Sequence, residues 1–143
     1  LADVPACVLS KTCIGTGTGT ELVPVENDLA GTPALLVNPQ VPVPTGPVFQ
    51  AWDGIDRGPL PTGSVREIAL AGRNDLEAAA IAQAPEIADV LDVLRQAKPM
   101  VARMSGSGAT CFALFENHDA MLDVMERLRF DRPAWWLLAG LLR

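Results

Sequence analysis

Residues 100–115 read MVARMSGSGATCFALF, in which two apolar runs flank a segment made only of small residues. The runs at 100–104 and 109–115 have the length and the flanking residues of buried β-strands. Between them, Gly106 and Gly108 give the backbone the freedom that a tight reversal of direction requires. We therefore expect two antiparallel strands joined by a loop of small residues.

Amphipathic helices are predicted on both sides of this hairpin. Asn74 has the character of an N-cap, with Glu77 at the capping-box position, and Pro85 suits the first turn of a second helix. Further apolar strands are predicted at 34–38 and 135–142. Apolar residues at helical spacing are Ile87, Val90, Leu91 and Leu94, and, after Asn117, Met121, Val124, Met125 and Leu128. Because strands and helices are interspersed without regular βαβ repeats, we expect an α+β fold with helices packed on one face of an antiparallel sheet.

The first part of the chain contains a different pattern. Glycine and threonine alternate over residues 15–20, which disfavours a helix and predicts the turn of a hairpin that leads into Glu21–Val25. Short helices are predicted at Phe49–Trp52 and Val65–Leu70, on either side of the loop Gly54–Ser64.

Composition excludes several classes of protein. The 143 residues carry a formal charge of -6 and show no basic cluster, which disfavours electrostatic binding to nucleic acid or to an anionic membrane. The longest apolar run, 134–142, is far shorter than the ~20 residues of a membrane-spanning helix. The 3 cysteines form no C-x-x-C pair, so neither a disulfide framework nor a zinc knuckle is predicted. A reducing, cytoplasmic location fits these features best.

The loop Ser105–Ala109 is the sharpest candidate for a ligand site. Glycines let successive backbone N–H groups converge on one anion, so phosphate could be bound without a lysine. The loop lacks the spacing of a Walker P-loop and is followed by a strand, which argues against a site at a helix N-terminus. A tight hairpin connection with no ligand explains the same residues, and both interpretations stay open on the residues alone.

Three other positions are ambiguous. Asp3 precedes Val4-Pro5 and is either an N-capping carboxylate or a catalytic one. In Thr45–Phe49 a turn presents the Phe49 ring, for which the core is the default and stacking on a ligand is the alternative. His118 is the only histidine, so metal clusters and triads that need histidine lack parts, and we expect it to cap a helix in solvent. No metal ligands are predicted.

Four segments, in the correct order, resemble the 4-diphosphocytidyl-2-C-methyl-D-erythritol kinases of the GHMP superfamily. They are ADVP at 2–5, residues 35–49 with their PTGPVF, NDLE at 74–77 and RMSGSGA at 103–109. The chain departs at Leu1, where that family usually has glycine. The resemblance implies the C-terminal part of a kinase, in which residues 1–27 are a remnant of the ATP-binding domain and residues 28–143 form a ferredoxin-like substrate domain.

The resemblance also implies roles for individual residues. The intact enzyme would use ATP, with Mg²⁺, to phosphorylate the 2-hydroxyl of a cytidine diphosphate alcohol in non-mevalonate isoprenoid biosynthesis. Asp3 corresponds to the catalytic aspartate. The substrate-binding positions are Thr45, Gly46 and Phe49, with Phe49 stacking on cytosine, and the phosphate loop is Ser105, Gly106, Ser107, Gly108 and Ala109. Asn74 is interpreted as a helix cap.

The lysine motif and the glycine-rich ATP loop of that family lie upstream of the aspartate and are not in this sequence. We therefore expect the chain alone to be inactive as a kinase, and its apolar segment Val4–Leu9 to favour self-association without the N-terminal domain. Two alternatives stay open: another small-molecule GHMP kinase, and a non-catalytic ferredoxin-like ligand-binding module that needs neither Asp3 nor phosphate.

Overall fold

The centre of the molecule is a four-stranded sheet. The computed structural model describes residues 4–17, 19 and 21–143. The strands are Pro33–Asn38 (β3), Val101–Met104 (β4), Cys111–Leu114 (β5) and Trp136–Leu141 (β6), in the order β4-β5-β3-β6. All three neighbouring pairs of this sheet are antiparallel. Leu35 in β3 lies opposite Ala113 on one side and Ala139 on the other, so the earliest strand of the sheet sits between two later ones.

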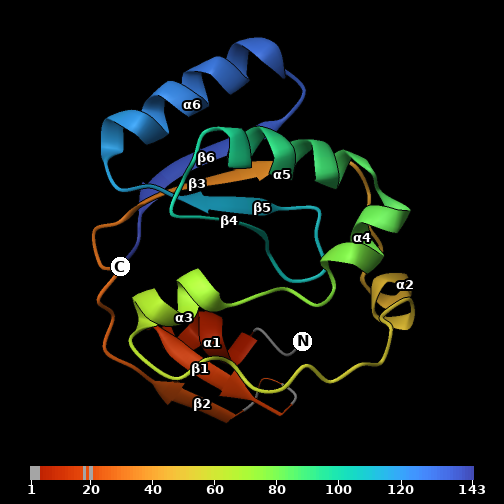
Figure 1. The fold of residues 1–143 in the computed structure, drawn as a ribbon, viewed down its shortest axis with the longest axis vertical. Helices are drawn as coiled ribbons and strands as arrows, with labels where there is room; N and C mark the ends of the chain where they lie inside the picture. The colour runs from red at the N-terminus through yellow and green to blue at the C-terminus, as the bar shows by residue number, and fades with distance from the viewer. Residues whose placement is uncertain (1–3, 18, 20) are drawn as a thin grey trace.

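Helices α5 (Glu86–Gln96) and α6 (His118–Asp131) cover one face of this sheet (Figure 1). Their inward residues pack on Leu35 and Val37 of β3, which are fully buried. The eight apolar residues predicted at helical spacing are all buried, namely Ile87, Val90, Leu91, Leu94, Met121, Val124, Met125 and Leu128. The expected α+β fold, with helices on one face of an antiparallel sheet, is confirmed.

The cap of α6 differs in one residue from the expectation. Asn117 is extended, and its Oδ1 accepts a hydrogen bond from the N–H of Ala120 at 2.9 Å. His118 is the first residue of the helix and is exposed. The prediction that His118 caps the helix is therefore wrong, because the preceding asparagine has the better acceptor geometry for that position.

The first residues form a separate small layer (Figure 1). It consists of α1 (Val4–Leu9) and the expected hairpin, which β1 (Cys13–Thr16) forms with β2 (Glu21–Pro24). Gly15 and Thr16, predicted as part of the turn, belong to β1. Val8 is 80% exposed, so α1 presents the predicted apolar surface. The boundary after residue 27 stays a prediction.

Helix α3 (Val65–Ala71) links this layer to the sheet, since Val65 and Ala69 pack beside Val101 of β4. Its N-terminus is a complete capping box, in which the side chains of Ser64 and Glu67 each accept a hydrogen bond from the other's backbone N–H.

The remaining helices, α2 (Thr45–Gln50) and α4 (Glu77–Gln83), begin at positions other than those expected. Helix α2 starts at Thr45 instead of Phe49, because Pro47 falls in the first turn, where its missing N–H costs no helical hydrogen bond. Helix α4 starts at Glu77, whose carboxylate binds Arg95 and closes no capping box on Asn74. The capping-box prediction is therefore wrong. In the described part of the chain, every helix is too short or too polar to cross a membrane.

Candidate functional site

The loop of small residues connects β4 to β5 as a tight hairpin. The N–H of Ser105 donates to the carbonyl of Thr110 at 2.8 Å, and the N–H of Gly108 donates to the carbonyl of Ser105 at 3.0 Å. Gly106 and Gly108 have φ of 55° and 88°, in the left-handed region that favours glycine. Within the described residues, the N–H groups of Gly106 and Ser107 donate to no protein acceptor. The loop is therefore a tight hairpin connection, and its two N–H groups without a protein acceptor could also bind an anion.

Helix α2 lies against this loop. The hydroxyl oxygens of Thr45 and Ser107 are 3.1 Å apart, within hydrogen-bonding distance, although 62 positions separate them in the sequence. A second link, from Asn38 Nδ2 to Thr110 Oγ1 at 2.9 Å, joins the end of β3 to the end of the loop. Two segments predicted separately as a substrate segment and a phosphate loop therefore meet.

The phenylalanine of α2 is available to a ligand. Phe49 is 57% exposed, and its neighbour Val48 is the residue of this helix that enters the core, with no exposed surface. The default placement of Phe49 in the core is therefore wrong. Gly46 also faces open space, since a Cβ built on it meets nothing within 4 Å. An exposed ring at one end of the helix and a hydroxyl at the other can contact the two ends of one elongated ligand.

Asn74 supports the loop through its side-chain amide, a role that the sequence did not predict. Its Nδ2 donates to the carbonyl of Met104 at 2.9 Å and to that of Gly106 at 2.8 Å. Its Oδ1 accepts from the N–H of Leu76 at 3.0 Å just before α4 begins. The NDLE motif at 74–77 was a signal that this asparagine has a role in the site, but Asn74 was interpreted as a helix cap.

The described part of the chain supplies no catalytic acid, base or nucleophile that the sequence predicted for this site. Asp3, the predicted catalytic residue, lies outside the described residues. Burial raises the pKa of the Cys111 thiol to about 12, so this cysteine is a packing residue and not a nucleophile. No group of three or more His, Cys, Asp or Glu side chains gathers as a metal site in residues 4–17, 19 and 21–143. The predicted phosphate loop and the predicted substrate segment lie at one end of the sheet. The roles predicted for Ser105–Ala109, Thr45, Gly46 and Phe49 stay predictions.

The chain is similar in sequence to proteins named as kinases. Residues 62–132 match the family described as GHMP kinases C terminal. The 4-diphosphocytidyl-2-C-methyl-D-erythritol kinase of Novosphingobium aromaticivorans is 59% identical, over 99% of this chain and 49% of that protein. Its counterpart from Erythrobacter litoralis is 54% identical, over 99% of this chain and 54% of that protein. The chain therefore spans about half the length of the curated relatives that it matches.

Solved structures agree with the sequence comparison. A crystal structure of 4-(cytidine 5'-diphospho)-2C-methyl-D-erythritol kinase has a TM-score of 0.76 and 28% identity, over 96% of this chain and 52% of that chain. A homoserine kinase from Cytophaga hutchinsonii has a TM-score of 0.57 at 19% identity, over 85% of this chain and 45% of that chain, which shows a shared fold alone.

Proposed function

We propose that this chain provides the substrate-binding part of a GHMP kinase, because it matches the C-terminal half of the 4-diphosphocytidyl-2-C-methyl-D-erythritol kinases. The intact protein would transfer the γ-phosphoryl group of ATP to the 2-hydroxyl of 4-diphosphocytidyl-2-C-methyl-D-erythritol. It would act in the cytoplasm, in isoprenoid biosynthesis.

Each part of the candidate site has a role in this proposal. The loop Ser105–Ala109 binds phosphate oxygens through the N–H groups of Gly106 and Ser107, which have no protein acceptor in the described part of the chain. Phe49 stacks on the cytosine ring, and Thr45 and Gly46 line the path between the ring and the loop. Phosphoryl transfer depends mainly on positioning and charge stabilisation, which a rigid loop and a stacking ring supply.

The catalytic carboxylate is assigned to Asp3 on the strength of the ADVP motif. It would orient the acceptor hydroxyl and take its proton as the oxygen attacks the γ-phosphorus, while the bond from that phosphorus to the ADP oxygen breaks. Mg²⁺ carried with ATP would neutralise charge on the phosphates.

The observation that carries this proposal is the 3.1 Å contact between the hydroxyls of Thr45 and Ser107. Phe49 lies one helical turn after Thr45 in α2, so this contact supports a shared surface for the exposed ring and the glycine loop. A cytidine diphosphate ligand needs such a surface for simultaneous recognition of its base and its phosphates. The match to relatives named for a cytidine diphosphate substrate supports the same ligand class.

Substitution of Phe49 tests the proposal. Titration calorimetry of the 143-residue chain with cytidine 5'-diphosphate should show binding that Phe49→Ala weakens about 5- to 150-fold, since stacking on an aromatic ring contributes about 1–3 kcal/mol.

Phe130→Ala is the matched control, because Phe130 is an exposed phenylalanine (86%) on α6, outside the site. It should leave the affinity unchanged. Equal affinities for all three proteins, or the absence of cytidine nucleotide binding, would contradict the proposal.

A further inference from the structure

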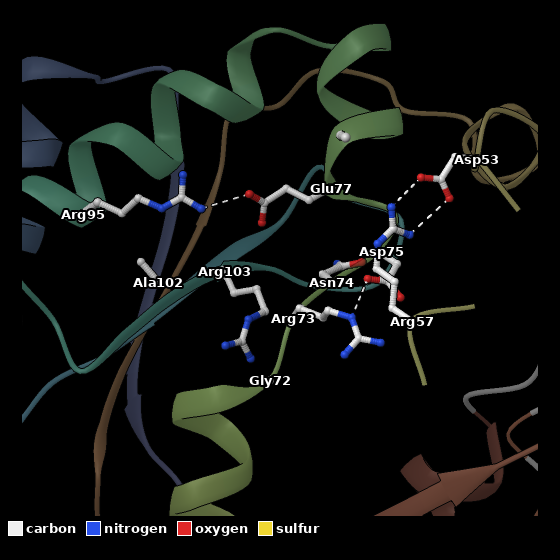
Figure 2. A pocket seen from close by; sticks show the side chains of 11 residues that line it. Asp53, Arg57, Gly72, Arg73, Asn74, Asp75, Glu77, Arg95, Ala102 and Arg103 are labelled. Carbon is white, nitrogen blue, oxygen red and sulfur yellow. Dashed lines mark hydrogen bonds and ion pairs between the residues drawn. The ribbon is translucent and has the colours of Figure 1, made fainter. Parts of the chain in front are cut away.

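A pocket lined by four arginines lies beside the edge strand β4 (Figure 2), and its lining includes Asn74, which donates a hydrogen bond to the carbonyl of Gly106 in the glycine loop. Its volume is about 470 Å³, enough for a small metabolite. The arginines come from separate segments, namely Arg57 from the 54–64 loop, Arg73 from the turn before α4, Arg95 from α5 and Arg103 from β4. None of the residues Ser105–Ala109 lines this pocket.

Three of these arginines already have carboxylate partners. Arg57 binds both carboxylate oxygens of Asp53, at 3.1 and 2.5 Å, and this guanidinium lowers the pKa of that carboxyl to about 2. The other pairs are Arg73 with Asp75 and Arg95 with Glu77, each at 2.9 Å (Figure 2). Each of the three carboxylates that line the pocket is therefore paired with one of these three arginines.

Arg103 is the fourth arginine, and no carboxylate lies within ion-pair distance of it in the described part of the chain. The one hydrogen bond that its side chain makes there runs from Nη2 to the carbonyl of Ala69, at 2.9 Å. A guanidinium carries five N–H donors in a fixed fork, so most of its donor capacity is unused.

The surroundings of Arg103 favour a bound anion. The side chain is half-buried, and burial lowers its pKa, an effect that the more distant Glu77 carboxylate partly offsets. A partly desolvated positive charge without a partner is unfavourable, and an anion that binds it bidentately removes that cost. A Cβ at Gly72 would lie 2.7 Å from the backbone oxygen of Ile68 and 3.2 Å from Arg103 Nη1, so a side chain at this position would crowd both α3 and the guanidinium.

We propose that this pocket is a second anion-binding site, separate from the glycine loop, in which Arg103 binds a phosphate or carboxylate group of a small metabolite. The inference goes beyond the proposed kinase function, because it needs neither cytidine nor ATP. Asn74 lines this pocket and also holds the carbonyls of Met104 and Gly106 in place. An anion here would therefore lie next to the residue that supports the loop proposed to bind substrate phosphate.

Titration calorimetry with inorganic phosphate, and separately with citrate as a carboxylate probe, tests the inference on the 143-residue chain. Arg103→Gln should weaken binding of the preferred probe at least about tenfold, because a hydrogen bond to a charged group is lost. The matched control is Arg66→Gln, which removes a similarly exposed arginine whose carboxylate partner, Glu116, lies outside the pocket. It should leave the affinity unchanged.

Two further variants keep the result interpretable. Arg103→Lys retains the charge without the fork and should bind several-fold more weakly than the natural chain, even if Arg103→Gln fails to fold. Phe49→Ala should retain phosphate or citrate binding, so failure of the kinase proposal and failure of this one are distinguishable. Undiminished binding in both Arg103 variants, or no binding of either probe to the natural chain, would overturn the inference.

Discussion

Gly108 shows how a single residue fixes the shape of the loop. Its φ of 88° is strained for any side chain, and an added Cβ would lie 3.0 Å from Met104 Sδ and 3.1 Å from Ile87 Cδ1. Gly106 also has a positive φ, of 55°, but a Cβ there meets nothing within 4 Å. The loop therefore packs closely against the core at Gly108, next to Ile87 of α5, while Gly106 faces open space.

These two glycines give a matched pair of substitutions. Gly108→Ala should lower the free energy of unfolding by about 2–4 kcal/mol, because left-handed strain and overpacking add together. Gly106→Ala should cost only about 1–2 kcal/mol, from the strain alone. Urea unfolding of both variants checks this difference. Equal losses of stability would show that the core does not contact the loop at Gly108.

Between elements, Asn74 is the junction that joins the start of α4 to the β4–β5 hairpin. One amide nitrogen serves two carbonyls of the hairpin, while the amide oxygen serves the turn before the helix. Loss of the nitrogen would leave two carbonyls without that donor at the point where the loop meets the helix.

Asn74→Asp removes the donors and keeps an oxygen for Leu76. It should lower the free energy of unfolding by about 1–3 kcal/mol and weaken cytidine 5'-diphosphate binding, because the loop loses its support. Asn117→Asp is the control, since that cap uses only its oxygen and aspartate is an equally good N-cap. Chemical denaturation and calorimetry measure both effects, and equal stability of the two variants would contradict the assigned role of Asn74.

Elements with a strong period were predictable from the sequence, and contacts between distant segments were not. The 3.6-residue spacing that begins at Ile87 and at Met121 correctly gave the buried faces of α5 and α6. The residue pattern alone gave the core as the default for Phe49, because prolines obscure the start of α2, whereas the family resemblance implied a ring available to a ligand. The role of Asn74 in supporting the loop depends on a partner 32 positions away, which no local pattern encodes.

For the whole molecule, the sheet order explains why the candidate site forms where it does. β3 runs antiparallel to β5, so its last residue, Asn38, lies beside Thr110 at the end of the glycine loop. After β3 ends there, the chain continues into α2, in which the hydroxyl of Thr45 contacts that of Ser107. The surface formed in this way includes residues from three separate parts of the sequence.

A crystal structure of the chain with bound 4-diphosphocytidyl-2-C-methyl-D-erythritol tests the central claim most directly. We predict that the cytosine stacks on Phe49 and that phosphate oxygens accept hydrogen bonds from the N–H groups of Gly106 and Ser107. Ligand density elsewhere, with the Phe49 ring and the loop both uncontacted, would contradict the claim that these two segments form one substrate site.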